Sequence, residues 1–255
     1  MSEKPIRTAL VTGAGARIGR AIAENLGRQG WTIAVHYNRS SQGADETAAA
    51  IAAGGGKAET VQADLADETS VQDLIAMAAA RVGPLTCLIN NASMFDYDDA
   101  QSATRETWDS HMAVNMRAPF VLTQNFESQL PDAQDGNVIN IIDQRVRKLT
   151  PHFMTYTISK VGLWGMTQTL AQALAPRIRV NGIGPGPTLP SKRQDRAVFD
   201  KQIAALPLER GPEPSEIARA VDFILAMPSL TGQMIAVDGG QHLAWRTPDT
   251  DGISE

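Results

Sequence analysis

A strand, a glycine-rich loop, a helix and a second strand follow one another at the start of the chain, and this order constrains the fold most. Thr8 to Thr12 and Trp31 to His36 are apolar runs rich in residues that favour strands. Between them, apolar side chains recur every four residues as on a helix, and Gly30 follows, where a left-handed cap costs little. Such strand–helix–strand units build parallel α/β sheets.

The loop of this unit contains Gly13, Gly15 and Gly19. Glycine lets the backbone turn tightly and approach a pyrophosphate, whose charge is met by free N–H groups at the helix start. The spacing is one residue longer than the common dinucleotide fingerprint, and a plain tight turn is the alternative. Placement between a first strand and a first helix favours a cofactor loop that includes Gly13, Arg17, Ile18 and Gly19.

The end of the second strand indicates which dinucleotide binds. Enzymes that prefer NAD usually place an acid there to hold the ribose 2′-hydroxyl. This chain has no acid there, and the residues are His36, Tyr37, Asn38, Arg39 and Ser40. Arg39, with Arg17 from the glycine loop and a serine hydroxyl, suits a 2′-phosphate through charge-assisted hydrogen bonds. We therefore expect NADPH, the alternative being that Arg39 is a solvated loop charge.

The rest of the chain continues the alternation of strands and helices. Further strand-like runs are Lys57 to Ala63, Leu85 to Asn90, Val138 to Ile142, Arg177 to Ile183 and Gln233 to Val237. Helical segments include 43–53, Ser70 to Arg81, 104–130, the segment around Tyr156 and Ser215 to Ala226. Seven strands predict an α/β fold, a single Rossmann-type domain over residues 1–255. We expect a seven-stranded, parallel, doubly wound sheet with helices on both faces.

Ligands of doubly wound sheets bind at the carboxyl ends of the strands. Candidate residues at these ends are Asp64, Leu65, Asn91, Ala92, Ser93, Asp143, Pro185 and Gly186. The carboxylate of Asp64 suits the adenine amino group, and the small residues after the fourth strand let the chain pass close to a flat cofactor. Gly184 to Pro190 is too rich in proline for a helix or central strand. We expect a substrate lid around 184–210, and a frayed or intersubunit tail after Trp245.

Tyr156 and Lys160 lie four residues apart, on one face of a predicted helix. A phenol loses its proton near about pH 10, and an ammonium one turn away should bring that pKa toward neutrality. Such a tyrosine can protonate an atom while hydride arrives at its neighbour. The alternative is a half-buried tyrosine beside a solvated lysine, because the pattern is short.

Composition excludes several other functions. The net charge of −5 gives no support to nucleic-acid binding or to a basic membrane surface. The single cysteine, Cys87, excludes an intrachain disulfide and a structural zinc cluster. No apolar run approaches the roughly 18 residues of a membrane helix. We expect a cytoplasmic protein without metal, nucleic-acid or membrane partners.

The chain resembles the short-chain dehydrogenase/reductase family over residues 6–243. The matching motifs are TGAGARIG, the Asp64 position, NNAS, Asn115, YTISK, NGIGPG and the final DGG. The resemblance implies an NAD(P)-dependent oxidoreductase in which Tyr156 is the catalytic acid. It implies that Lys160 holds the nicotinamide ribose and lowers the Tyr156 pKa, and that Asn115 positions a water. It also implies a homotetramer or homodimer packed through helices around 105–130 and 155–175.

Two positions depart from the family pattern. Asp143 stands where the family usually has serine, and Arg17 where it has a small residue. Both departures resemble the pteridine reductase branch, and the dihydromonapterin reductases share the aspartate. On this resemblance Phe95 stacks on one face of a pterin, with nicotinamide on the other face. Ser93 and Arg17 would contact the pterin or the cofactor phosphates, and Asp143 and Tyr156 would contact the substrate.

The leading hypothesis is an NADPH-dependent reductase that transfers hydride to a C=N bond of a pterin or dihydropterin, with dihydrofolate and dihydromonapterin among the candidates. A carboxyl beside Tyr156, its pKa raised by burial, can share or relay the proton that nitrogen needs. A carbonyl or 3-oxoacyl reductase of the same fold is one alternative. A non-catalytic NADPH-binding sensor is another, although it has no need of Tyr156, Lys160 and Asn115.

Overall fold

Seven parallel strands form one sheet in the order β3-β2-β1-β4-β5-β6-β7. The structure is a computed structural model and describes residues 6–190 and 195–244. The strands are β1 Thr8–Val11, β2 Thr32–Tyr37, β3 Lys57–Gln62, β4 Cys87–Asn90, β5 Gly136–Ile141, β6 Ile178–Pro185 and β7 Met234–Val237. The strand order reverses between β1 and β4, so the predicted doubly wound α/β sheet is confirmed.

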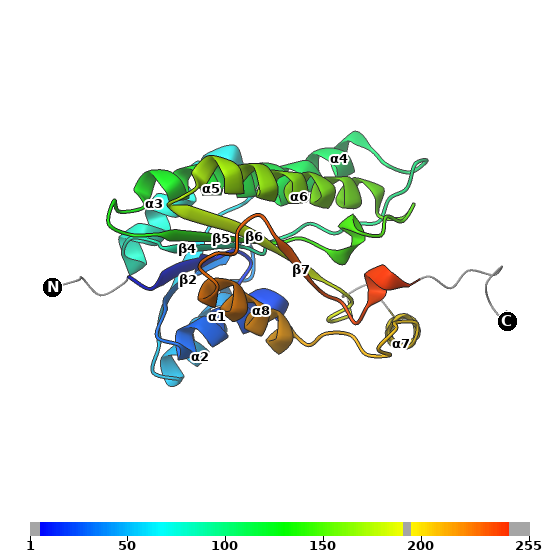
Figure 1. Cartoon of the computed structure of the whole chain (residues 1–255), viewed down its shortest axis with the longest axis horizontal. Coiled ribbons are helices and arrows are strands. Elements are labelled where there is room, and N and C mark those ends of the chain that lie inside the picture. The colour runs from blue at the N-terminus through cyan, green and yellow to red at the C-terminus, as the bar shows by residue number, and fades with distance from the viewer. Residues whose placement is uncertain (1–5, 191–194, 245–255) are drawn as a thin grey trace.

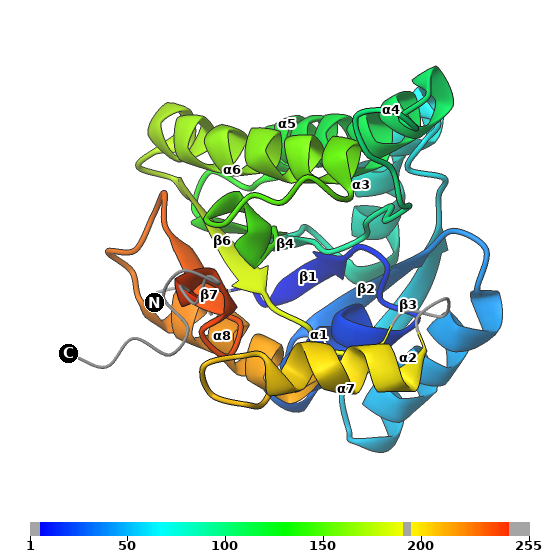
Figure 2. The ribbon, with the colours of Figure 1, turned by 90° about the vertical axis from the view of Figure 1, so that its right-hand side faces the viewer.

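Helices cover both faces of the sheet. They are α1 Arg17–Arg28, α2 Ser41–Ala53, α3 Glu68–Val82, α4 Arg105–Met112, α5 Ala118–Gln129, α6 Met154–Leu174, α7 Arg196–Ala204 and α8 Pro214–Ala226. Shorter turns are η1 Ala113–Arg117, η2 Gln144–Val146 and η3 Gln241–Leu243. Figure 1 shows α3 to α6 above the sheet and α1, α2 and α8 below it. Figure 2 shows α7 at the edge of the sheet, on the side of α1 and α2.

Alternate strand residues supply the cores on the two faces. Ala9 and Val11 of β1 pack in the cluster that includes α1, α2 and α8, whereas Leu10 packs in the cluster with α3 and α5. All three side chains are fully buried. A parallel sheet covered on both faces needs such continuous apolar strands, and this fixes the strand ends that bear the site. No helix within the described ranges has the length and apolar character to cross a membrane.

The strand β6 is longer than the sequence predicts, because it includes Gly184 and Pro185. These residues pair with Ala236 and Val237 of β7, whereas pairing with β5 ends at Ile183. The amides of Gly182 and Gly186 donate toward β7, to the carbonyls of Gln233 and Val237. The nitrogen of Pro185 therefore faces the β5 side, where pairing has ended, and its missing N–H costs no ladder bond.

The segment expected to be a lid contains a helix that the sequence analysis did not predict. Asp195 caps α7, and its carboxylate accepts a hydrogen bond from the amide of Ala197 at 2.8 Å. Residues 191–194 of the expected lid, and the tail after Trp245, lie outside the described residues.

The predicted helix over 104–130 is interrupted by one turn of π-helix, η1, centred on Asn115. The amide of Ala118 donates to the carbonyl of Ala113, five residues earlier, instead of four. Pro119 lies in the first turn of α5, where a missing N–H is tolerated. The distortion of this helix therefore lies at Asn115 and not at Pro119. The side chain of Asn115 is fully buried.

Candidate active site

A cavity of about 1160 Å³ opens at the carboxyl edge of the sheet. It lies between the loops that follow β1, β4, β5 and β6 and the start of α6. The predicted site residues in its wall are Gly13, Arg17, Ile18, Gly19, Asn91, Ala92, Ser93, Phe95, Asp143, Tyr156, Lys160, Pro185 and Gly186. The sheet therefore brings together the substrate candidates, most of the cofactor candidates and all of the catalytic candidates except Asn115.

The remaining cofactor candidates lie beside this cavity, at the ends of β2 and β3. Arg39 and Ser40 are exposed just before α2, and Leu65 is buried. The amide nitrogen of Asn38 donates to Oδ1 of Asp64 at 3.1 Å, so these two side chains form one polar edge. This group lies at the carboxyl ends of two neighbouring strands, next to the glycine loop.

His36, expected among the cofactor residues, lies beneath the glycine loop and not in the cavity wall. Its Nδ1 accepts the amide N–H of Gly13 at 3.0 Å, and its Nε2 donates to the carbonyl of Ala63 at 3.1 Å. Burial lowers the pKa of His36 to about 4, so the ring is neutral, as these two bonds require. His36 therefore positions the loop from below.

The glycine loop has the shape of a phosphate cradle. Gly13 has a left-handed φ of 65°, and a Cβ on Gly19 would lie 2.4 Å from the carbonyl oxygen of Gly13. Ala16, which caps α1, makes no side-chain hydrogen bond, and the first turn of α1 has no acid. The N-terminal amides of α1 are thus uncapped by a side chain, and an anion at this end of the helix would be stabilised.

Arg17 adopts a left-handed φ of 56° at the start of α1. Its guanidinium donates to the carbonyls of Leu189 at 3.0 Å and Pro190 at 2.8 Å. Burial lowers the pKa of Arg17. The side chain thereby links the glycine loop to the segment after β6.

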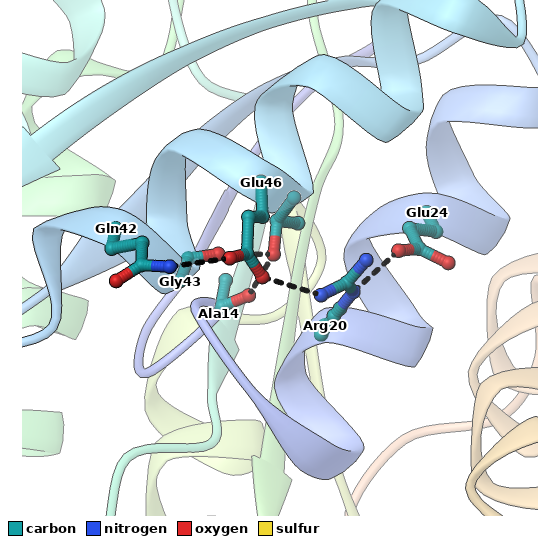
Figure 3. Close-up of polar contacts among 7 residues, drawn as sticks. Ala14, Arg20, Glu24, Gln42, Gly43 and Glu46 are labelled. Atoms are coloured by element: carbon teal, nitrogen blue, oxygen red, sulfur yellow. Dashed lines mark hydrogen bonds and ion pairs between the residues drawn. The ribbon is translucent and has the colours of Figure 1, made fainter.

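Helix α2 supports the outer side of this loop. Figure 3 shows Arg20 between Glu24 and Glu46. Its Nε lies 2.7 Å from Oε1 of Glu24, and its Nη1 lies 3.4 Å from Oε2 of Glu46. The hydroxyl of Thr47 donates to the carbonyl of Ala14 at 3.1 Å. Because Thr47 is fully buried, this bond ties α2 to the loop at a position that water does not reach.

Tyr156 and Asp143 form the reactive pair of the cavity. The phenol of Tyr156 donates to Oδ2 of Asp143 at 2.7 Å, and Oδ1 accepts the amide of Arg145 at 2.8 Å. Burial raises the pKa of Asp143, although the Arg145 amide and charge oppose the shift. Burial and the neighbouring carboxylate raise the pKa of Tyr156 well above its usual value. The phenol therefore keeps its proton until a better acceptor arrives.

The expectation that Lys160 lowers the pKa of Tyr156 is wrong for this arrangement. The ammonium donates to the carbonyl of Ile141 at 2.9 Å and lies 5.7 Å from the centre of the phenol ring. The carboxylate of Asp143, at hydrogen-bond distance, acts on the phenol more strongly. The cation that does oppose the shift is Arg145. Burial itself lowers the pKa of Lys160 to about 8.

Asn115 stands behind the cavity wall and joins two of its elements. Its Oδ1 accepts the amide of Met94 at 2.8 Å and the hydroxyl of Ser93 at 3.1 Å. Its Nδ2 donates to the hydroxyl of Ser159 at 3.0 Å and to the carbonyl of Met94 at 3.0 Å. The side chain is thus fully used in holding the loop after β4 against α6.

An aromatic wall closes the end of the cavity next to Tyr156. Phe95 stacks on Phe153 with centres 4.4 Å apart, and its ring meets Tyr156 edge to face at 4.6 Å. The guanidinium carbon of Arg145 lies 4.9 Å from the centre of Phe153 and 5.7 Å from that of Phe95. Phe95 was expected here, but Phe153 and Arg145 were not. Phe153 directly precedes α6 and Arg145 lies in the short turn η2, so neither shows a periodic pattern, and closeness in sequence to Tyr156 and Asp143 was the available signal.

A second unpredicted group lies under the first turn of α6. The carboxylate of Asp98 accepts the amide of Thr155 at 3.1 Å and also its hydroxyl. That hydroxyl accepts from Nδ1 of His111 at 2.7 Å, and Nε2 of His111 accepts the amide of Asp96 at 3.1 Å. Asp98, Thr155 and His111 are each 1% exposed, so these bonds are sheltered from water.

The residues present fit a bound dinucleotide. The cradle between Gly13 and Gly19 faces the uncapped start of α1, and the cavity reaches from there to Lys160 and Tyr156. Its volume of about 1160 Å³ slightly exceeds the range of about 300–1000 Å³ that is usual for ligand pockets. Within residues 6–190 and 195–244, no cluster of histidine, cysteine and carboxylate side chains has the composition of a metal site.

Fold and site define a class of oxidoreductase, and comparison with known proteins agrees. Residues 7–199 match the short chain dehydrogenase family, and the chain belongs to this family. It is 51% identical to the FolM alternative dihydrofolate reductase 1 of Brucella canis, solved in complex with NADP. That match covers 96% of this chain and 97% of the other, with a TM-score of 0.92.

Two further relatives are named for different reductions. The FolM alternative dihydrofolate reductase 1 of Brucella suis, also solved with NADP, is 50% identical over 98% of this chain and 99% of the other, with a TM-score of 0.92. The 3-oxoacyl-[acyl-carrier-protein] reductase of Synechocystis is 31% identical over 94% of this chain and 98% of its own length. NADP in both Brucella structures agrees with the cofactor expected from the sequence.

Proposed function

We propose that this protein is an NADPH-dependent reductase of C=N bonds in pterins or dihydropterins. The observation that carries the proposal is a carboxyl, Asp143, hydrogen-bonded to the phenol of Tyr156 next to the ring of Phe95. A ketone oxygen needs a single donor, whereas a pterin offers ring nitrogens and an amino group and needs a proton on nitrogen. The identity of about half to two alternative dihydrofolate reductases supports this substrate class.

The cofactor would bind along the floor of the cavity and supply the hydride. Gly13, Gly19 and the start of α1 would hold its diphosphate, and the ammonium of Lys160 would hold the nicotinamide ribose. Arg39, with Ser40 and Arg17, would bind the 2′-phosphate. Asn38, Asp64 and Leu65 would border the adenine, and Asn91, Ala92, Pro185 and Gly186 the nicotinamide end.

The chain itself delivers the proton. Tyr156 donates from its phenol, and Asp143 shares that proton and holds the basic edge of the ring. Phe95 packs against the pterin, while Ser93 and Arg17 contact its edge or the cofactor phosphates. Pro119, four residues after Asn115, has no N–H to donate to the backbone carbonyl of Asn115. That carbonyl would hold a water behind the phenol.

The segment 184–210 is proposed to be a lid over this substrate. Asp195, Val198 and Phe199 of α7 and its cap line the cavity, so this helix forms part of the cavity wall. Phe199 is 7% exposed and packs inward, whereas Val198 is 55% exposed. Closure of such a lid would exclude water from the reacting atoms.

The proposal is tested by following NADPH oxidation with dihydropterins, dihydrofolate and a panel of ketones. The wild type should reduce the dihydropterins, and Tyr156→Phe should lower kcat by about 10²–10⁴-fold because the proton donor is lost. Asp143→Asn, which keeps the shape of the side chain, should lower kcat for C=N substrates. NADPH affinity, measured by fluorescence quenching, serves as the control and should change little in either variant.

Turnover confined to ketones would contradict the proposal that pterins are the substrates. It would favour the carbonyl or 3-oxoacyl reductase that the Synechocystis relative suggests. If Tyr156→Phe left every measured activity unchanged, the protein would instead be a sensor that binds NADPH without using it.

A further inference from the structure

The charged side chains of the cavity wall differ in whether their charged ends have partners. Those of Arg17, Lys160, Asp143 and Asp195 are hydrogen-bonded to the chain itself. The fifth charged side chain of this wall is Arg145, and its guanidinium has no hydrogen-bond acceptor within the described ranges 6–190 and 195–244. A half-buried guanidinium without an acceptor loses solvation that a ligand can restore.

The guanidinium of Arg145 is nevertheless held in place. It lies over the rings of Phe153 and Phe95, which are themselves stacked with centres 4.4 Å apart. The amide of Arg145 is fixed by Oδ1 of Asp143 at 2.8 Å. Contact with aromatic faces engages the flat surface of a guanidinium and leaves its N–H edge available. Arg145 is therefore a preorganised cationic fork in the cavity wall.

The fork lies beside the place where the ring of the substrate would bind. Phe95 contacts Tyr156 on one side and Phe153 on the other, and Tyr97 meets Phe153 edge to face at 5.2 Å. Tyr97 also lines the cavity. A substituent that extends from a pterin bound at Tyr156 would therefore pass the aromatic surface and reach the guanidinium of Arg145. An arylamine linked to an amino-acid carboxylate has this sequence of groups.

We propose that Arg145 is an anion subsite that binds a carboxylate on the side chain of the pterin substrate. The enzyme would thus prefer dihydropterins whose substituent ends in an acid to those with a neutral polyol. A guanidinium edge matches the two oxygens of a carboxylate, whereas a hydroxyl chain offers no charge. This inference rests on the proposed reduction of pterins and names the class of substrate within it.

The test uses substrates that share the reduced pterin and differ in the tail. Dihydrobiopterin has no carboxylate, dihydropteroate has a benzoate, and dihydrofolate has a glutamate. Arg145→Met should raise KM for the two acids by about tenfold or more, with KM for dihydrobiopterin within about twofold of the wild type. Arg145→Lys keeps the charge and loses the fork, so its KM values for the two acids should lie between those of the wild type and those of Arg145→Met. Substrate differences in KM are the readout, because Arg145 also acts on the Tyr156–Asp143 pair in every reaction.

Arg147 offers a matched control next to the same turn. Its guanidinium donates to the carbonyl of Met234 at 2.8 Å and does not line the cavity. Arg147→Met removes the same charge and should leave the ratio of the three KM values unchanged. If Arg147→Met raised KM for the two acids relative to that for dihydrobiopterin as much as Arg145→Met does, the effect would be one of general charge, and the subsite would be overturned.

Binding of p-aminobenzoylglutamate, followed by calorimetry, gives a readout that needs no turnover. The wild type should bind this fragment, Arg145→Met should weaken it by about tenfold, and added salt should weaken it in the wild type. An equal KM change for all three substrates, or unchanged fragment binding, would overturn the inference. If the wild type reduced no dihydropterin, the proposed function would fail, and fragment binding would still decide whether the anion subsite exists.

Discussion

At the residue scale, His36 shows how a buried side chain outside the cavity sets the geometry of the site. Its two ring nitrogens bond the amide of Gly13 and the carbonyl of Ala63, and the ring is 1% exposed. Protonation would turn the acceptor nitrogen into a donor facing another N–H. The glycine loop is therefore shaped correctly only while His36 is neutral, which makes its stability depend on pH.

Acid should destabilise the protein through His36. The pKa is 6.5 in an ordinary chain and about 4 in the fold, so the unfolded state binds more protons between these values. The contribution is complete above pH 6.5 and should be lost, by about 3 kcal/mol, as pH falls to 4. Denaturant unfolding of the wild type and of His36→Gln measures this, and the variant should lack this part of the pH dependence. Parallel curves for the two proteins would contradict it.

At the element scale, the start of α6 depends on a residue from the loop after β4. Phe153, the first residue before the helix, has a left-handed φ of 56° and makes no capping bond with its side chain. Asp98 replaces that cap, because its carbonyl accepts the amide of Phe153 at 2.8 Å and its carboxylate accepts the amide of Thr155. The loop that bears Phe95 and the helix that bears Tyr156 are thereby fixed to each other.

Asp98→Asn should loosen this junction and lower both stability and kcat. Loss of a capping carboxylate costs about 1–2 kcal/mol, which thermal or denaturant unfolding would detect. NADPH affinity should be retained, because the glycine loop lies on a different element. Asp99→Asn is the matched control, since Asp99 is partly exposed and bonds Ser102 within its own turn. Equal effects of the two substitutions would refute a special role for Asp98.

At the scale of the whole molecule, α6 leaves apolar side chains on its outer face. Ile158 and Val161 are each 41% exposed and lie three residues apart, and Trp108 of α4 is 43% exposed. Contacts link α4 to α6, so these side chains belong to neighbouring elements. Exposed apolar groups of this kind mark interaction surfaces, and the family resemblance implies subunits packed through these helices.

Val161→Lys should therefore shift the protein toward a smaller species in size-exclusion chromatography with light scattering. A charge at the centre of an apolar interface is costly to bury, and assembly should weaken with it. Met77→Lys, on α3, is the control because Met77 is 36% exposed on another helix. A wild type that is monomeric at all concentrations would remove the basis of this prediction.

The parts of this molecule that could be predicted from sequence are those with a period or a fixed spacing. The strands, the glycine loop and the approach of Asp143 to Tyr156 follow from apolar runs and from the rule that parallel strands place ligands at one edge. Phe153 and Arg145 have no such pattern, and a left-handed backbone at a phenylalanine is not signalled by residue type. The direction in which the pKa of Tyr156 shifts depends on its distances from Asp143 and Lys160, which the sequence spacing alone does not give.

The hydrogen bond between Tyr156 and Asp143 also bears on how the site regains a proton after a reduction. On the proposed mechanism, each reduction removes a proton from the pair, and the pair must regain it from bulk water before the next turnover. Tyr156 is 6% exposed and Asp143 has an intermediate exposure, so we expect the incoming proton to reach the carboxyl first and the phenol second. On the proposed function, an aspartate in place of the usual serine would set the route by which protons return between cycles, in addition to favouring C=N substrates.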